Sequence, residues 1–398
     1  MSGKTLRLNK GADRRLKQGH LWIYSNEVDI KATPLKLFEP GEQVQIQNSS
    51  GREMGTAFVS PASLICGRMI SRKKTQQMDQ SLLTHRLNIA LSLRKQVFDR
   101  PFYRLVFGDS DALPGLVIDR FDDVLVVQIS CAGMETLKGE LIKALEKVCH
   151  PRTIVFKNDG KMRARENLAS YVEVGAGEEV EEARVEENGV HFIVPIMSGQ
   201  KTGWFYDHRM NRARLRHYVQ GKRVLDLYSY IGGWGVQAAA FGAESVTCVD
   251  SSSRALAYVE RNAALNGVED KMSCLEGDVM DVCRALKEEG QRFDVVIVDP
   301  PAFIPRRKDQ KAGEQAYQRL NQLAMRLLSK DGLLVSGSCS MHLSRSTLVN
   351  IIRVTGQTLE KQLQIVESGS QGPDHPIIPA IPETEYLKAL FVRVLPAQ

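Results

Sequence analysis

The sequence contains no long apolar run, although 43% of its 398 residues are hydrophobic. No stretch approaches the ~20 consecutive apolar residues that a membrane-spanning helix needs. The first seven residues, Met-Ser-Gly-Lys-Thr-Leu-Arg, also lack the apolar segment of a secretory signal peptide. We therefore expect a protein of the cytoplasm that has no contact with a membrane.

Closely spaced cysteine pairs are absent as well. The seven cysteines are widely scattered, odd in number and form no C-x-x-C pair. This pattern argues against a disulfide framework and against a metal site, and it predicts that most of the thiols are reduced and buried. Cys248 and Cys274 lie inside apolar strand patterns, where burial is expected.

There is little excess of either charge, because 53 basic residues face 47 acidic ones and the net charge is +6. Basic residues nevertheless crowd the start of the chain, and a second group lies at 72–74. Such clusters are usually solvated surface, and they indicate phosphate contacts only with support from elsewhere. In this chain the candidates for substrate contact are Arg14, Arg15 and Lys17.

The length of the chain predicts two to three domains, each able to bury its own core. Residues 1–76 form a β-rich unit, in which we expect strands at 43–47, 57–59 and 64–70. Residues 77–188 predict a central α+β domain. Its expected elements are helices at 82–97 and 137–148 and strands at 105–107, 115–119, 124–129 and 153–156. The stretch 175–187 carries six glutamates and is expected to be a linker or an exposed hairpin.

Residues 189–398 alternate between strand and helix patterns, which predicts a doubly wound parallel sheet of the α/β, Rossmann-like class. A helix is expected at 254–265, with Ser252 or Ser253 as its N-cap and Gly267 at its end. The expected strands lie at 224–226, 245–249, 272–275, 295–298, 333–335 and 387–395.

The stretch 224–235 is the centre of this third unit. An apolar run ends there in Asp226 and leads into a glycine cluster, as when a buried strand meets a nucleoside-binding turn. Asp250 ends the next strand about two dozen residues later, where a carboxylate can bind the two hydroxyls of a ribose. The glycines are out of register for a dinucleotide fingerprint. The loop instead resembles the first motif of Rossmann-like methyltransferases, which bind S-adenosylmethionine.

Two further loops follow predicted strands, at the sheet edge where open α/β sheets bind their ligands. Asp278 can accept a hydrogen bond from an adenine amino group, or it is simply a helix cap. In Asp299-Pro-Pro-Ala-Phe303 the two prolines stiffen the loop, so that the acid and the aromatic ring can hold a flipped base.

Cys339 stands between two serines after the strand at 333–335. A thiol with small neighbours at a strand end is open to attack a substrate, although a lone cysteine is more often structural. Its place beside the other loops favours the catalytic interpretation.

These motifs, together with 105–119, Gly199-Gln-Lys-Thr-Gly-Trp-Phe-Tyr-Asp-His-Arg and Ser338-Cys-Ser, resemble a known family over essentially the whole chain. It is the family of bacterial large-subunit rRNA methyltransferases with a PUA β-barrel, a central α+β domain and a Rossmann-like class I methyltransferase domain. The resemblance implies S-adenosylmethionine as cofactor, 23S rRNA or a precursor of the large subunit as partner, and Cys339 as nucleophile. The chain departs from the family at Asn188, where a histidine is usual. The resemblance implies no chemical role for that histidine, so the substitution leaves the expected activity unchanged.

On this basis we predict three sets of site residues. The catalytic residues are Cys339 and Asp299. The cofactor-binding residues are Asp226, Tyr228, Gly232, Asp250, Ser251, Asp278, Asp299 and Pro300. The substrate-binding residues are Arg14, Arg15, Lys17 and Phe303.

The resemblance also implies methylation at C5 of a cytosine. Because cytosine C5 is a poor nucleophile, we expect a thiolate to add to C6 first, with Asp299 holding the proton at N3. Two alternatives stay open. The Asp-Pro-Pro-Ala-Phe loop also suits direct methylation of an exocyclic amine, and a PUA-type RNA-binding protein without activity is a third interpretation. His342 and His375 are candidates for the C5 proton acceptor, although both are more typical of loop or surface residues. A homodimer is one expectation for the oligomeric state.

Overall fold

A computed structural model describes residues 4–397. The chain forms two compact units, each assembled from several stretches of sequence. Unit 1 comprises Met1–Ala183, Pro195–Tyr206 and Pro373–Thr384, and unit 2 comprises Arg184–Val194, Asp207–Gly372 and Glu385–Gln398. This division does not separate 1–76 from 77–188, so the three-domain boundaries stay a prediction.

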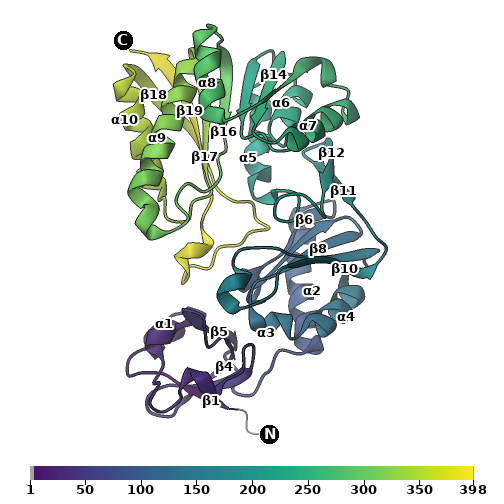
Figure 1. Cartoon of the computed structure of the whole chain (residues 1–398), viewed down its shortest axis with the longest axis vertical. Helices are drawn as coiled ribbons and strands as arrows, with labels where there is room; N and C mark the ends of the chain where they lie inside the picture. The colour runs from purple at the N-terminus through teal and green to yellow at the C-terminus, as the bar shows by residue number, and fades with distance from the viewer. Residues whose placement is uncertain (1–3, 398) are drawn as a thin grey trace. The chain divides into compact units, whose positions relative to one another are not determined.

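The N-terminal part of unit 1 is a small β-domain (Figure 1). Its five-stranded sheet has the order β1-β3-β4-β5-β2. A bridge between Leu8 and Val28, just beyond the two edge strands, brings these edges together as in a small barrel. The predicted strands are confirmed. The elements are β1 (Thr5–Arg7), α1 (Asp13–Lys17), β2 (Trp22–Tyr24), η1 (Ser25–Glu27), η2 (Leu35–Leu37), β3 (Gln43–Gln47), β4 (Glu53–Val59) and β5 (Ile65–Ser71).

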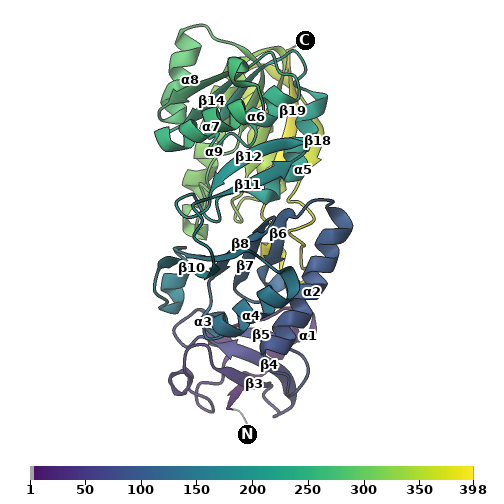
Figure 2. The ribbon, with the colours of Figure 1, turned by 90° about the vertical axis from the view of Figure 1, so that its right-hand side faces the viewer.

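The central part of unit 1 is a second five-stranded sheet, in the order β10-β9-β8-β7-β6 (Figure 2). Helices α2 and α4 pack on each other and share a core with β6–β9. The α2 helix begins where Asp79 caps the Leu82 amide at 2.8 Å. The elements are α2 (Gln80–Val97), β6 (Phe102–Phe107), η3 (Gly108–Asp111), β7 (Leu116–Phe121), β8 (Val124–Ile129), α3 (Ala132–Glu135), α4 (Lys138–Cys149), β9 (Thr153–Asn158), η4 (Arg163–Glu166) and β10 (Tyr171–Gly177).

The prediction of a linker or exposed hairpin at 175–187 is confirmed in part. The chain passes from unit 1 to unit 2 within this stretch, but several of its residues are buried. The first residues of this stretch end β10, which pairs with β9, and its last residues form β11 (Glu182–Glu187), which pairs with β12 (Val190–Pro195). Glu187 is only 2% exposed and accepts hydrogen bonds from Arg212 Nε at 2.6 Å and Gln237 Nε2 at 2.9 Å. A carboxylate with such partners can be buried, and composition alone does not reveal them.

Unit 2 is built on a seven-stranded sheet in the order β15-β14-β13-β16-β17-β19-β18. The five strands from β15 to β17 are parallel. In contrast, β19 runs antiparallel to both of its neighbours, so the sheet is not wholly parallel as predicted. An antiparallel neighbour needs no crossover helix, and a loop indeed joins β18 to β19. Helices α8, α9 and α10 form one layer, and α6 and α7 pack together on β14 (Figures 1 and 2).

The remaining elements confirm the predicted alternation. Ser252 is the N-cap of α7 and accepts from the Ala255 amide at 3.2 Å. The elements are η5 (Tyr206–His208), α5 (Arg209–Arg214), η6 (Leu215–His217), β13 (Arg223–Leu227), α6 (Gly235–Ala240), β14 (Ser245–Asp250), α7 (Ser253–Leu265), η7 (Glu269–Lys271), β15 (Met272–Glu276), α8 (Val279–Glu288), β16 (Phe293–Val298), η8 (Arg307–Asp309), α9 (Gln310–Leu327), β17 (Leu328–Ser338), α10 (Arg345–Thr358), β18 (Lys361–Gly369), η9 (Pro382–Thr384) and β19 (Lys388–Pro396).

The segment 373–384 follows β18 in sequence but belongs to unit 1. Asp374 accepts a hydrogen bond from the Arg104 amide at 3.0 Å, and its carbonyl accepts from Arg94 at 2.8 Å. Arg94 is fully buried and also binds both carboxylate oxygens of Asp111, at 2.6 and 2.8 Å. This buried, fully hydrogen-bonded arginine fixes the segment in unit 1.

Cysteine burial follows the prediction with one exception. All seven thiols are free, and five of them are buried. Cys248 is fully buried, whereas Cys274 is only half-buried because β15 is an edge strand of the sheet. Within the described residues, no cluster of three potential metal ligands occurs, and no helix has the length and apolarity to cross a membrane.

Candidate functional site

The predicted site residues of unit 2 lie at or just after the carboxyl ends of parallel strands. Asp226 lies in β13, Asp250 ends β14, Asp299 follows β16, and Cys339 follows β17. Because these strands are parallel, all four loops lie at one edge of the sheet.

Asp226 holds the first loop from within. Its side chain is fully buried, and Oδ2 accepts the Gly235 amide at 2.8 Å. Oδ1 is buried and accepts no hydrogen bond. Burial, chiefly, raises the pKa of Asp226 to about 8. A bound cation would therefore be stabilised here, because it would favour the ionised carboxylate and give Oδ1 a partner.

The backbone of the first loop is turned back on itself. Tyr228, Tyr230 and Gly232 have φ values of 63°, 49° and 85°. Gly232 is required here, since an added Cβ would lie 2.7 Å from the Val236 side chain. The turn leaves the Tyr228 ring against Phe303, with ring centroids 6.4 Å apart.

Asp250 fastens this loop to the next one. Its Oδ2 accepts the Tyr230 amide and its Oδ1 the Ser252 amide, each at 2.9 Å. Each oxygen retains a lone pair for a ligand hydroxyl, and the residue is half-exposed. The neighbouring Ser251 is exposed.

Asp278 acts as a helix cap, which was one of its two predicted roles. Its Oδ1 accepts the Met280 amide at 2.9 Å and the Asp281 amide at 3.2 Å at the start of α8. The side chain is exposed, and Oδ2 is left for a further donor. The capping bond therefore orients the carboxylate without using all of its acceptor capacity.

These loops fit S-adenosylmethionine. Asp226 has an acceptor atom suited to the cationic amine, and Asp250 has acceptors suited to the ribose hydroxyls. Asp278 has one suited to the adenine amine. No pyrophosphate is needed to satisfy this loop, in line with its departure from the dinucleotide fingerprint.

Asp299 is held by two aromatic side chains. Trp234 Nε1 donates to Oδ2 at 2.9 Å, and His208 Nε2 lies 3.2 Å from Oδ1. The two rings also pack on each other, with centroids 5.2 Å apart. Burial acts to raise the pKa of Asp299, but the charge of His208 and the two contacts outweigh it and hold the pKa below its ordinary value. Asp299 is therefore a carboxylate at neutral pH.

The rest of the Asp299 loop presents the Phe303 ring. Pro300 is buried, and Pro301 and Ala302 are exposed. Phe303 is half-buried and packs on Tyr317 of α9, with ring centroids 4.9 Å apart. Its ring is therefore fixed in place while part of its surface stays accessible.

Cys339 is held between two hydrogen-bonded serines. Ser338 Oγ donates to Tyr317 Oη at 2.9 Å, and Ser340 Oγ lies 2.8 Å from the same hydroxyl. The Ile304 amide also donates to Ser340 Oγ, at 3.2 Å, which ties the Cys339 loop to the Phe303 loop. The Cys339 thiol is half-buried, with Sγ 3.9 Å from the Pro300 carbonyl oxygen. The Cys339 thiol, the Phe303 ring and the Asp299 carboxylate therefore lie at the same edge of the sheet, and hydrogen bonds link their loops.

The basic residues of α1 are already partly engaged. Arg15 binds both oxygens of Glu27, at 2.8 Å each, and Lys17 lies 2.5 Å from Asp13. Arg14 is exposed and makes no ion pair with any described residue. A phosphate contact is easiest to reconcile with Arg14, and the role of all three residues stays a prediction.

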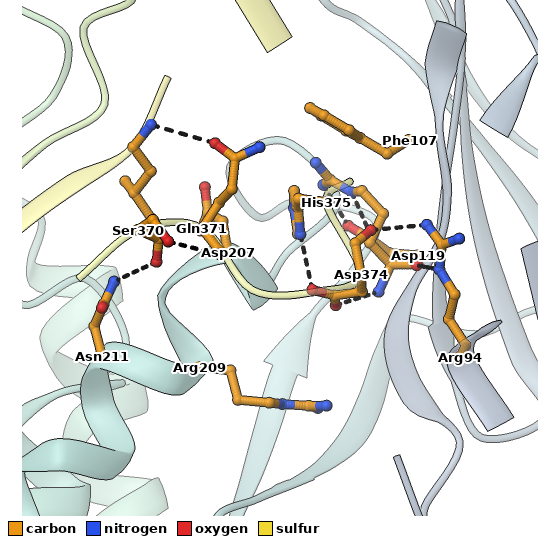
Figure 3. Close-up of polar contacts among 12 residues, drawn as sticks. Arg94, Phe107, Asp119, Asp207, Arg209, Asn211, Ser370, Gln371, Asp374 and His375 are labelled. Carbon is orange, nitrogen blue, oxygen red and sulfur yellow. Dashed lines mark hydrogen bonds and ion pairs between the residues drawn. The ribbon is translucent and has the colours of Figure 1, made fainter. Parts of the chain in front are cut away.

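Four residues of this edge escaped prediction: His208, Trp234, Tyr317 and Lys388. His208 lies in the motif 199–209 and Trp234 in the motif 224–235, but only the fold brings them to Asp299. No sequence pattern marks Tyr317 as a site residue. Lys388 could have been found from the sequence, because it is a charged residue at the start of an apolar strand. His375, in contrast, lies in a loop of unit 1, as expected, but it is buried there, with Nδ1 2.9 Å from Asp374 Oδ1 (Figure 3).

The linker of unit 2 that precedes the sheet is also anchored near this edge. Asn211 Nδ2 donates to the Ser370 carbonyl at 3.0 Å (Figure 3), and the Gly372 amide donates to the Asp207 carbonyl at 3.1 Å. Tyr386 Oη donates to Asp207 Oδ2 at 2.6 Å. These bonds fix the chain on both sides of His208.

The strand order and the loops at its edge define a class I methyltransferase domain. Residues 111–393 match the family of S-adenosylmethionine-dependent methyltransferases, and residues 6–72 match the PUA-like domain. Ribosomal RNA large subunit methyltransferase I of Erwinia tasmaniensis is 34% identical over 397 residues, 98% of each chain. The protein of that name from Aliivibrio fischeri is 35% identical over 394 residues, again 98% of each chain.

A solved methyltransferase in complex with SAH covers 98% of this chain and 100% of its own, with a TM-score of 0.84 and 23% identity. At that identity the likeness shows the fold alone. The chain belongs to the PUA-domain, S-adenosylmethionine-dependent methyltransferases related to ribosomal RNA large subunit methyltransferase I. It is an S-adenosylmethionine-dependent enzyme.

Proposed function

We propose that the protein methylates C5 of a cytosine in large-subunit ribosomal RNA, the substrate named for its relatives, with Cys339 as nucleophile. The main support for this proposal is the hydrogen-bonded group of Ser338, Tyr317 and Ser340. This group holds the half-buried thiol of Cys339 beside the Asp299–Phe303 loop.

In this proposal, Phe303, Cys339 and Asp299 have separate roles in the reaction. Phe303 stacks on the flipped base, and the Cys339 thiolate adds to C6, which places an electron pair at C5. The cofactor, when bound, supplies the electrophilic methyl group. Asp299 accepts the hydrogen bond of the N3 proton that solvent provides, and this stabilises the adduct. Loss of the C5 proton to water then expels the Cys339 thiolate, and return of the N3 proton to solvent restores the neutral pyrimidine.

A tritium-release assay tests this reaction. Large-subunit rRNA that contains cytidine tritiated at C5 should release one tritium into water for each methyl group transferred, because C5 exchanges its hydrogen for the methyl. Transfer to an exocyclic amine, the alternative chemistry for an Asp-Pro-Pro-aromatic loop, would leave all C5 tritium in the RNA. Methylation without tritium release would therefore contradict the proposal.

We also propose the predicted cofactor contacts, and Asp250→Ala tests them. Loss of a charge-assisted pair of hydrogen bonds should weaken S-adenosylmethionine binding by roughly 1.5 to 3 kcal/mol in calorimetry. Asp270→Ala is a matched control, because Asp270 lies in η7, ahead of β15 and so at the opposite edge of the sheet. Equal affinity of the Asp250 variant and wild type would remove Asp250 from the site.

For the N-terminal unit, 1–76, we propose RNA binding through Arg14, Arg15 and Lys17. Replacement of all three by glutamine should weaken RNA binding and lower the slope of log affinity against log salt by about 1 per lost phosphate contact. Cofactor affinity should not change. The control replaces Lys31, Lys36 and Arg52, three exposed basic residues of the same domain. If both triple variants have the same RNA affinity and salt dependence, the three α1 residues are not the RNA-binding site of this domain.

The further proposals are coarser. We propose that 77–188 and 189–398 are separate domains beside the PUA-like one and that the protein acts in the cytoplasm, where its RNA substrate is found. A homodimer stays a hypothesis.

A further inference from the structure

Lys388 is a buried lysine next to the proposed nucleophile. It begins β19, opposite Ser338 of β17, and Ser338 directly precedes Cys339. The residue is 4% exposed. Burial of an ammonium group is costly unless its charge is compensated, so its partners matter.

The hydrogen-bond partners of Lys388 are neutral. Its Nζ donates to the carbonyl oxygens of Ser340 at 2.6 Å and Tyr386 at 2.7 Å. Among the described residues, no carboxylate lies within 4.0 Å of Nζ to form an ion pair. The two carbonyls satisfy the donors of the ammonium group but do not neutralise its charge.

Three charged or titratable groups influence the pKa of Lys388: Cys339 after β17, Arg345 at the start of α10, and Glu385 before β19. Burial, above all, lowers the pKa of Lys388 to about 8, and Arg345 acts in the same direction, while Cys339 and Glu385 oppose them. The Arg345 guanidinium is turned to β18, where it binds Ser368 and the Gly369 carbonyl.

We propose that Lys388 is a positioning residue whose ammonium group serves as the counter-ion of the Cys339 thiolate. The proposal rests on the proposed function, in which Cys339 is the nucleophile. A neighbouring lysine stabilises a thiolate over a thiol, and the thiolate is the form that attacks C6. The bond from Nζ to the Ser340 carbonyl adds a second effect, because it holds the backbone directly after Cys339, where Ser340 Oγ also lies 2.8 Å from the Tyr317 hydroxyl.

The pH dependence of Cys339 alkylation in the free protein tests this pairing. The protein is treated with iodoacetamide between pH 5 and pH 10, and the rate at each cysteine is measured by peptide mass spectrometry. In wild type, the midpoint for Cys339 should lie at least about one pH unit below the ordinary thiol value of about 8.5. Half-buried Cys274 is the internal control, since burial raises its pKa to about 11.

Lys388→Met should move the Cys339 midpoint up by about one pH unit or more, because a methionine keeps the volume of the side chain but removes the charge. The Cys274 profile should not move. Lys361→Met, which removes an exposed lysine of β18 in the same sheet, should leave both profiles as in wild type. Thermal melting and S-adenosylmethionine binding show whether the variant is folded.

Two results would overturn the pairing. One is a wild-type Cys339 midpoint at or above the ordinary thiol value, which decides the matter even if Lys388→Met does not fold. The other is an unchanged Cys339 midpoint in a folded Lys388→Met protein. Neither result depends on RNA. A failure of the proposed C5 chemistry would appear in the tritium assay instead, with the alkylation shift intact.

Discussion

Replacement of Cys339 by alanine should abolish methyl transfer, with a rate loss on the order of 10³-fold or more, because no other group at the sheet edge can add to C6. Binding of S-adenosylmethionine and RNA should persist, since the thiolate acts along the reaction path and not in the ground state. Single-turnover methylation rates and separate binding titrations measure the two effects.

Cys274→Ala is the matched control for this experiment. Cys274 is the other half-buried cysteine of unit 2 and lies within β15, away from the Asp299 loop. Its variant should methylate at the wild-type rate. Near-wild-type activity of Cys339→Ala would instead end the C5 account and make the Asp299–Phe303 loop the centre of an N-methyl transfer site.

Asp299→Asn should give the second large loss, roughly 10²- to 10³-fold in kcat, with a much smaller change in cofactor affinity. Asparagine keeps the shape of the side chain but replaces one acceptor by an amide donor. Either Trp234 or His208 then faces a donor, and the N3 proton loses its carboxylate. Measurement of kcat, together with the cofactor Kd, separates catalysis from binding.

The pH profile gives a further check on Asp299. Because His208 and Trp234 hold its folded-state pKa below the ordinary value of 3.8, the carboxylate should stay ionised down to that value. Its contribution would be lost only as pH falls through the lowered pKa. Asp309→Asn is the control for Asp299→Asn, since Asp309 is paired with Arg306 on the surface just after the same loop. Equal methylation rates for Asp309→Asn and Asp299→Asn would contradict a catalytic role for Asp299.

Local patterns predicted the local features. Val44 and Ile46 alternate with polar residues in β3, and both are buried as this period requires. The serine before 254–265 caps α7 because its hydroxyl meets a free amide at the helix start. The acid and glycines at 224–235 indicated a ligand loop, since few other functions need a buried carboxylate beside such a turn.

Features that depend on distant partners could not be predicted. Trp234 and Asp299 meet although 65 positions separate them in the sequence. Glu187 looked like part of an exposed acidic stretch, and only the fold brings Arg212 and Gln237 to it. The direction of β19 likewise follows from the loop that joins it to β18, and its apolar pattern would suit either direction.

The central claim of this account is that Cys339 forms a covalent bond to C6 of the target cytosine. Large-subunit rRNA bearing 5-fluorocytosine tests it most directly, because fluorine cannot leave C5 as a proton does and the thioether persists. With S-adenosylmethionine present, the wild-type protein should migrate with the RNA under denaturing conditions, and peptide mapping should find the nucleotide on Cys339. A fully methylated RNA product with no protein attached, or a cross-link at any other residue, would contradict the account.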